Sequence, residues 1–104
     1  MDLPKLYVVG IGPGGDEHLS YIAKKTIEKS DVIVGYKTYI ELINHLIDTQ
    51  EVYSTPMMGE IKRCEAAIEY ALKGRVTTVV CSGDAGIYGL SGLILELLEK
   101  KRAA

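Results

Sequence analysis

At 104 residues the chain is long enough for one domain with a single core and short for a complete two-domain enzyme. Its 47% hydrophobic and 25% charged residues argue against disorder, and a formal net charge of -2 without a basic stripe argues against nucleic acid as a partner. No apolar run reaches roughly 20 residues and the N-terminus lacks the features of a signal peptide, so we expect a cytoplasmic protein that does not contact a membrane.

The first half of the chain alternates two predicted strands with two predicted helices. Residues 6–9 form a short apolar run ended by glycine, which predicts a strand covered on both faces. Residues 19–29 have the apolar spacing of a helix. That spacing is carried by Leu19, Ile22, Ala23 and Ile27. A second strand over 31–34 is followed by a turn at 35–39 and by a helix over 39–47 with one wide apolar face.

The third predicted strand, residues 51–54, is short and half polar, which places it at a sheet edge. Pro56 disfavours helix immediately before it, so residues 55–59 are expected to form a loop. A helix follows over residues 60–73, and Gly74 provides its C-terminal cap. The apolar stripe of this helix comprises Ile61, Cys64, Ile68, Ala71 and Leu72.

The fourth predicted strand, residues 76–80, is the most β-branched run of the chain. A turn leads from it into a helix over residues 87–98, whose basic end at residues 100–102 suits the negative end of the helix dipole. Four strand and helix units in alternation predict an α/β fold, with a doubly wound parallel sheet of four strands between two helical layers. The chain stops after a helix, without a closing strand.

Two glycine-rich turns follow the first and the fourth strand, at residues 10–16 and 81–89. Loops beyond the carboxyl ends of parallel strands are where open α/β sheets bind their ligands. Each turn carries an aspartate beside its glycines, Asp16 in the first and Asp84 in the second. Because loops after strand ends often carry function, the two turns predict one shared ligand site, although tight connection alone is the other interpretation.

The first turn has the spacing G-x-G-x-x-G in Gly10, Gly12 and Gly15, which is typical of dinucleotide-binding proteins. Such proteins also place an acidic residue near the end of the second strand, where this chain has glycine, tyrosine and lysine at 35–37. Pro13 removes a backbone N–H that would face pyrophosphate. The pattern therefore disfavours a nicotinamide or flavin site, and a nucleoside triphosphatase is disfavoured because no phosphate loop ends in Gly-Lys-Ser/Thr.

Small and aromatic residues add two features near the second turn. Gly86, Gly89 and Gly92 recur every third residue, which indicates either close packing of the helix on the sheet or close approach of a ligand to its backbone. Several residues near the presumed ligand edge could line a cleft for a large flat ligand. They are Tyr36, Tyr53, Tyr88, Met57 and Met58.

The cysteines and histidines do not predict a metal site. Cys64 and Cys81 lack the spacing of metal ligands, and a disulfide between them cannot be inferred from sequence. Cys81 is best interpreted as a small buried residue at a strand end. His18 and His45 are isolated from other candidate ligands, and we expect both at the surface.

Three segments of the chain resemble the tetrapyrrole methylase family, and in particular its precorrin-3B C17-methyltransferase, or cobalt-factor III methyltransferase, branch. The matching segments are residues 9–14 (VGIGPG), 31–39 (DVIVGYKTY) and 82–89 (SGDAGIYG). The first is shared across the family, whereas the other two are characteristic of the branch. The resemblance implies transfer of a methyl group from S-adenosylmethionine to carbon 17 of a precorrin, with contraction of the ring, in cobalamin and porphyrin-related biosynthesis.

The resemblance also implies the sheet order 3-2-4-1-5, in which both glycine turns lie side by side, and it assigns roles by position. The residues implied in binding S-adenosylmethionine are Pro13, Gly83, Asp84, Ile87 and Tyr88. Those implied in binding the tetrapyrrole are Gly12, Gly14, Met57 and Met58. Asp16 is the candidate catalytic residue, although family members often have the aspartate directly after Pro-Gly, whereas Gly15 intervenes here.

The resemblance covers residues 1–104 as the N-terminal domain of a two-domain enzyme. It implies that the fifth strand and a C-terminal domain are missing, that this polypeptide is inactive alone, and that the full-length enzyme is a homodimer acting on a precorrin or cobalt-precorrin. Two alternatives stay open. One is another methylase of this fold, acting on uroporphyrinogen, a different precorrin or a protein histidine, and the other is a non-catalytic module that binds a nucleoside-like ligand or a partner domain.

Overall fold

The computed structural model of the protein describes residues 5–11 and 19–103, except for the side chains of residues 84 and 85. Four strands alternate with four helices and one short 3-10 helix along these residues. The elements in order are β1 (Leu6–Gly10), α1 (Tyr21–Lys29), β2 (Val32–Tyr36), α2 (Lys37–Leu42), the 3-10 helix η2 (Asn44–Leu46), β3 (Glu51–Thr55), α3 (Glu60–Leu72), β4 (Thr77–Cys81) and α4 (Asp84–Ala103).

All four strands form one parallel sheet in the order β1-β4-β2-β3. Leu6 is level with Thr77, and Val32 is level with both Thr77 and Glu51, so the strands run in close register. Because parallel strands leave their carboxyl ends at one edge, the segments after β1 and β4 emerge next to each other. The order confirms the first four places of 3-2-4-1-5, with β3 at one edge of the sheet as predicted.

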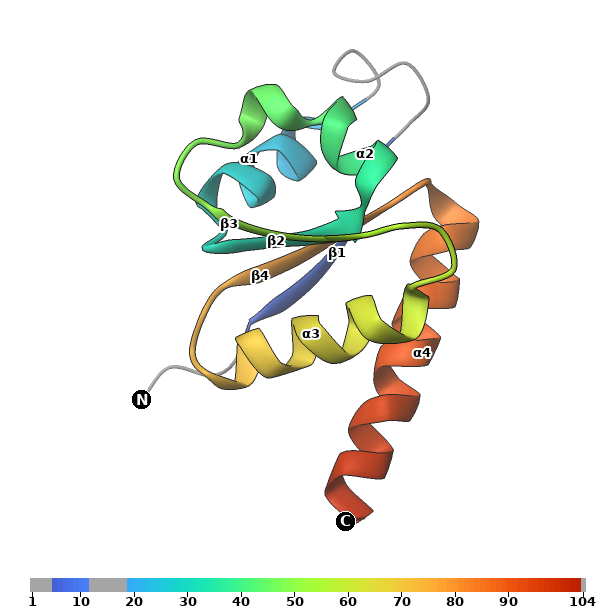
Figure 1. Ribbon diagram of the computed structural model, residues 1–104. Helices are drawn as coiled ribbons and strands as arrows, with labels where there is room; N and C mark the ends of the chain where they lie inside the picture. Colours follow the sequence, from blue (N-terminus) through green and yellow to red (C-terminus); the bar gives the residue numbers. More distant parts are fainter. Residues whose placement is uncertain (1–4, 12–18, 104) are drawn as a thin grey trace.

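Helices cover both faces of the sheet, which confirms the predicted three-layer arrangement. Figure 1 shows α1 and α2 on one face and α3 and α4 on the other. Side chains of β2 alternate between the two layers: Val32 and Val34 pack with the residues of α3 and α4, whereas Ile33 packs with those of α1 and α2. Burial on both faces explains why the strands read as continuous apolar runs in the sequence.

The second strand is longer than predicted, because residues that were expected in a turn pair with β3. Gly35 is level with Ser54 and Tyr36 with Thr55, and α2 begins directly at Lys37. Cross-strand pairing therefore extends β2 through Gly35, whose missing side chain makes room for Val80 of the neighbouring strand. A Cβ at Gly35 would lie only 2.5 Å from Val80 Cγ2.

The second predicted helix is in fact two shorter pieces, α2 and η2. Ile43 leaves the helical region at φ -111° and ψ 15°, and its amide bonds to the Ile40 carbonyl three residues back. Ile43 is nevertheless 1% exposed, so the predicted apolar face is retained and only the regular helix is lost. Gln50 holds the end of this segment in place, because its side-chain amide donates to the carbonyl oxygens of Ile27 and Leu46.

Three side chains predicted on buried stripes are exposed instead. Ile22 of α1 is 75% exposed because it lies beside β1, an edge strand with no further neighbour among the described residues. Ile61 and Leu72 lie in the first and last turns of α3 and are also exposed. The cap of α3 is as predicted: Gly74 has φ +89°, and its amide donates to the carbonyl of Ala71. None of the helices described has the length and apolar character needed to cross a membrane.

Candidate functional site

The ends of β1 and β4 bring the two glycine turns into contact. Gly10 is level with Cys81, and the Ile11 amide donates to the Cys81 carbonyl at 2.8 Å. A Cβ added to Gly10 would lie 2.9 Å from Ile87 Cδ1 and 3.2 Å from Gly83 Cα. The second turn therefore packs directly against the start of the first. The candidate residues Gly12, Pro13, Gly14 and Asp16 lie outside the described residues.

The turn after β4 keeps one side of its backbone open. Gly83 has φ +153°, a conformation that favours glycine, and no described atom lies within 4 Å of where its Cβ would be. Its carbonyl accepts a hydrogen bond from the Ile87 amide at 2.8 Å, which begins the ladder of α4. Asp84 is the first residue of α4, at the end of the helix that favours negative charge. A ligand can therefore approach this turn closely along its backbone.

Of the predicted contacts in α4, Ile87 and Tyr88 lie in different surroundings. Ile87 is partly buried and packs against the core formed by β2, β4, α3 and α4. Tyr88 is 79% exposed on the outside of the helix. Ile87 thus supports the turn from beneath, whereas Tyr88 is available to a ligand only from the solvent side.

A cavity of about 270 Å³ opens at the same edge of the sheet, toward β2 and β3. It lies between the start of α2, the loop after β3, and the first turns of α3 and α4. The cavity is lined by Tyr36, Tyr39, Met57, Met58, Glu60, Arg63, Ser82, Gly86 and Leu90. Met57 and Met58 therefore line the same cavity as Ser82 and Gly86 of the second glycine turn.

The aromatic and methionine side chains give this cavity adaptable walls. The rings of Tyr36 and Tyr39 meet edge to face, with centroids 5.3 Å apart. Met57 and Met58 are 71% and 85% exposed, so their flexible side chains project from the loop into solvent. Met58 has φ 71°, which is uncommon for a residue with a side chain and is often found at binding sites.

Arg63 is a charged residue of this cavity that the sequence did not single out. It is 7% exposed, and its Nη1 donates to the Thr55 hydroxyl at 2.6 Å. Its Nη2 lies 3.9 Å from Glu60 Oε1. Arg63 shares a helical face with Ala67 and Ala71, both buried, and that spacing of small residues was the available signal. The predicted apolar stripe of this helix included Ile61 and left out Arg63, whereas in the structure Ile61 is exposed and Arg63 is buried.

The helical glycines of α4 differ in what surrounds them. A Cβ at Gly86 would lie 3.2 Å from Ser82 Oγ and 3.3 Å from Cys81 Cβ, so close packing accounts for Gly86. No described atom lies within 4 Å of a Cβ built at Gly89 or at Gly92. Packing on the sheet therefore explains one of the three glycines and leaves the other two without that explanation.

The two thiols are unsuited to chemistry. Cys64 and Cys81 are free and buried, which confirms the interpretation of Cys81 as a small core residue. Burial raises the pKa of the Cys64 thiol to about 11, and burial also raises the pKa of the Cys81 thiol, against a smaller opposing effect of the Gly83 backbone. Because the thiolate is the nucleophile, both groups are inert near neutral pH. Within the described residues no three His, Cys, Asp or Glu side chains come together as a possible metal site.

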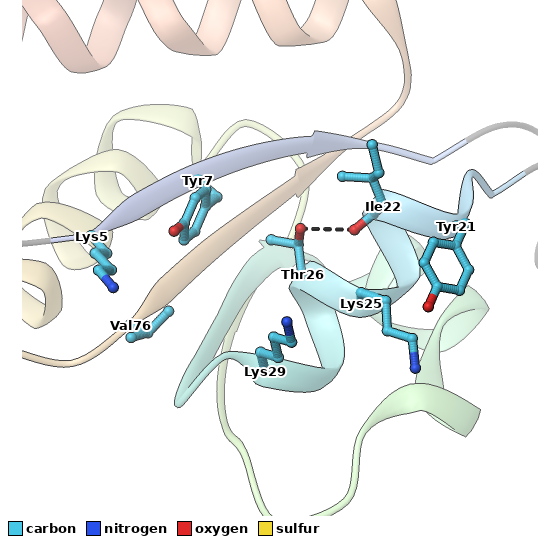
Figure 2. A pocket seen from close by; sticks show the side chains of 8 residues that line it. All are labelled: Lys5, Tyr7, Tyr21, Ile22, Lys25, Thr26, Lys29 and Val76. Atoms are coloured by element: carbon cyan, nitrogen blue, oxygen red, sulfur yellow. Dashed lines mark hydrogen bonds between the residues drawn. The ribbon is translucent and has the colours of Figure 1, made fainter.

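A larger hollow of about 770 Å³ lies away from the glycine turns, along the open side of β1. Figure 2 shows the residues that line it, with Tyr7 on β1 and Tyr21, Ile22 and Lys25 on α1. Thr26 is tied to its own helix, since its hydroxyl donates to the Ile22 carbonyl at 2.8 Å. Size alone would favour this hollow, but it lacks the glycine turns and the carboxyl strand ends on which the candidate site rests.

Comparison with known proteins decides the family. The family model for tetrapyrrole (corrin/porphyrin) methylases matches residues 5–104. The chain belongs to the tetrapyrrole methylase family. This tetrapyrrole methylase chain is 46% identical over 97 residues to the cobalt-factor III methyltransferase of Priestia megaterium, covering 93% of this chain and 18% of that protein. It is also 43% identical over 97 residues to a probable cobalt-factor III C(17)-methyltransferase of Salmonella typhimurium, covering 93% of this chain and 40% of that protein.

The fold agrees with that assignment. The crystal structure of the methyltransferase CobJ superposes with a TM-score of 0.81 at 29% identity, over 92% of this chain and 40% of that one. The tetrapyrrole methylase chain thus spans two fifths or less of the length of these relatives. The family inferred from the three sequence segments is confirmed. The relatives named for cobalt-factor III also agree with the branch that those segments indicated.

Proposed function

We propose that this chain is the N-terminal part of an S-adenosylmethionine-dependent methyltransferase that methylates carbon 17 of a precorrin or cobalt-precorrin, with ring contraction, in cobalamin biosynthesis. The observation that carries the proposal is the identity of 43% to 46%, over 93% of the chain, with relatives named for cobalt factor III. The contact of the two glycine turns at the carboxyl edge supports it, because a nucleoside-sized ligand can reach both at once.

The residues around the second turn fit the methyl donor. The open backbone at Gly83 leaves space for a ligand where any side chain would project. Ile87 packs beneath the turn, Asp84 is the first residue of α4, and Tyr88 is exposed one turn further along the helix. With Pro13 of the first turn, these four are the proposed cofactor-binding residues. S-adenosylmethionine, when bound, would supply a methyl group already activated by its sulfonium charge.

The protein's own contribution to the reaction is proposed to be mainly positional. A partly reduced tetrapyrrole carbon is electron-rich enough to act as the nucleophile, so side chains need to align the two ligands and exclude water. We assign the tetrapyrrole to Gly12 and Gly14 of the first turn and to Met57 and Met58 of the loop before α3. Asp16 is the proposed general base for later ring steps.

Titration with S-adenosylhomocysteine, followed by backbone amide shifts, tests the cofactor site. We expect the largest shifts at residues 10–15 and 83–89, because these two turns are proposed to form one half-site. Gly83→Ala should abolish the response, since alanine is strained at φ +153°, while the matched Gly92→Ala should leave it unchanged. Absence of shifts at these two turns, or an unchanged response in Gly83→Ala, would contradict the assignment of this turn.

Methylation itself is proposed to need the rest of the enzyme. The chain spans 18% and 40% of these two relatives, so a C-terminal domain, and a homodimer in the cytoplasm, belong to the proposal for the full-length protein. We expect no methyl transfer to a cobalt-precorrin by the 104-residue chain alone. Detectable methylated product, measured by mass spectrometry, would show that this half carries a complete active site.

A further inference from the structure

We infer that Arg63 and the cavity beside it form a subsite for a carboxylate of the bound ligand. The inference rests on the proposed function, because that function supplies two carboxylate sources. One is the acidic side chains at the rim of a tetrapyrrole, and the other is the amino-acid end of the methyl donor. The subsite lies between α2, α3 and α4, next to the second glycine turn.

The first argument is the weak neutralisation of a buried charge. Arg63 is 7% exposed, and a buried guanidinium is costly unless it is paired and hydrogen-bonded. Its Nη1 donates to the hydroxyl of Thr55, which is neutral. The Glu60 carboxylate stands 3.9 Å from Nη2, beyond hydrogen-bond length, and the Glu60 side chain is 59% exposed. Water screens such a pair, so an additional anion would stabilise Arg63.

The second argument is the composition of the cavity that Arg63 lines. Among the lining residues, Tyr36, Tyr39 and Ser82 carry hydroxyl groups, and Met57, Met58 and Leu90 are apolar. Glu60 is the single acidic side chain among the lining residues described, and it lies in the first turn of α3. A guanidinium beside hydroxyl-bearing residues, in a wall whose one acidic side chain is the largely exposed Glu60, suits a carboxylate, which can accept two parallel N–H bonds.

The third argument is that the local backbone holds Arg63 in position. Gly59 has no room for a side chain, because a Cβ there would lie 2.6 Å from Thr55 Oγ1 and 2.8 Å from Thr55 Cβ. Met58, immediately before it, is held at φ 71°. The loop is therefore pressed against the same threonine that receives the Arg63 hydrogen bond. A side chain fixed in this way loses little freedom on binding, as expected for a preorganised anion site.

The experiment compares ligands with and without carboxylates in matched variants. Uroporphyrin III carries eight carboxylates, and its octa-amide carries none; S-adenosylhomocysteine retains the amino-acid end that 5′-methylthioadenosine lacks. Affinities are measured by fluorescence or calorimetry for the wild-type chain, Arg63→Gln, Arg63→Lys and Lys62→Gln. Lys62 neighbours Arg63 on the exposed side of α3, so Lys62→Gln controls for loss of one positive charge.

We expect Arg63→Gln to weaken the binding of one carboxylate-bearing ligand by roughly 10- to 100-fold, the range for a charged hydrogen bond. Binding of the matched ligand without that carboxylate should be unchanged. The affinity of Arg63→Lys for that ligand should lie between those of the wild type and Arg63→Gln, and the affinity of Lys62→Gln should equal that of the wild type. An effect on uroporphyrin alone assigns the carboxylate to the tetrapyrrole, and an effect on S-adenosylhomocysteine alone assigns it to the methyl donor.

Three results would overturn the inference, and they differ in what they say of the proposed function. If the wild type binds both probes and Arg63→Gln binds them equally well, the subsite is wrong and the proposed function stands. If the wild type binds neither probe, both proposals fail. A misfolded variant would lose the carboxylate and carboxylate-free ligands together, so a loss common to both members of a pair also counts against the subsite.

Discussion

At Gly35 the central strand β2 packs against its neighbour so tightly that even a methyl group must displace core atoms. The nearest of these atoms is Cγ2 of Val80, a branched and buried side chain, and Cδ1 of Ile40 follows at 3.1 Å. Gly35→Ala is therefore expected to lower the free energy of unfolding by about 1–3 kcal/mol, measured by urea denaturation. The double variant Gly35→Ala with Val80→Ala should lose less free energy of unfolding than the sum of the losses in the two single variants. Full stability of Gly35→Ala would contradict the packing described.

Burial of the Cys64 thiol is expected to make the protein less stable as the pH rises above 9. Its pKa is raised from 9.0 to about 11 in the folded chain, because burial disfavours the thiolate. Below pH 9 the Cys64 thiol keeps its proton in both the folded and the unfolded chain. Above pH 9 the unfolded chain releases this proton first, so the free energy of unfolding falls as pH rises toward 11. The loss is at most about 3 kcal/mol. The difference between wild type and Cys64→Ala in denaturation midpoints at pH 8 to 11 isolates this group, and parallel pH profiles would refute the prediction.

At the scale of a single element, α4 carries glycines that its own packing does not require. Gly89→Ala and Gly92→Ala should each raise stability by about 0.5–1 kcal/mol, because alanine restricts the unfolded chain and fits a helix. Gly86→Ala should lower stability, since its Cβ would press on Cys81 and Ser82. Thermal melts of the three variants test this ranking. If Gly89→Ala were stabilising yet impaired binding of S-adenosylhomocysteine, the glycine would be kept for the ligand.

At the scale of the whole molecule, β1 is an edge strand in a type of sheet that is usually covered. Tyr7 and Ile22 expose 42% and 75% of their side chains along this edge. The Ile11 amide bonds to β4, so by alternation the amides of Leu6, Val8 and Gly10 point to the open side. We expect these three amides to exchange rapidly in the 104-residue chain and slowly in the proposed full-length protein, measured by hydrogen exchange. Equal rates in both would show that the remaining chain does not cover this edge.

Much of this architecture followed from patterns that are local in the sequence. Short apolar runs ended by glycine or polar residues predicted the strands, because burial on both faces removes the alternation of polar side chains. The two turns with glycine and aspartate were predicted to follow neighbouring strands at one edge, and the segments after β1 and β4 do emerge together because parallel strands leave their carboxyl ends on the same side. The helix break at Ile43 and the exposure of Ile22 were not predictable, since each depends on which neighbours surround the element.

The sequence by itself determined the class of fold, the family and the place of the glycine turns, since these depend on local periodicity and on short motifs. Only the tertiary structure decided that Arg63 lines one cavity with Tyr36 and Tyr39 and donates a hydrogen bond to Thr55. Arg63 looks like a surface residue in a helical pattern, and its burial follows from the packing of α3 over the end of β3. Contacts of that kind join segments that no sequence window contains, so they exist only once the chain has folded.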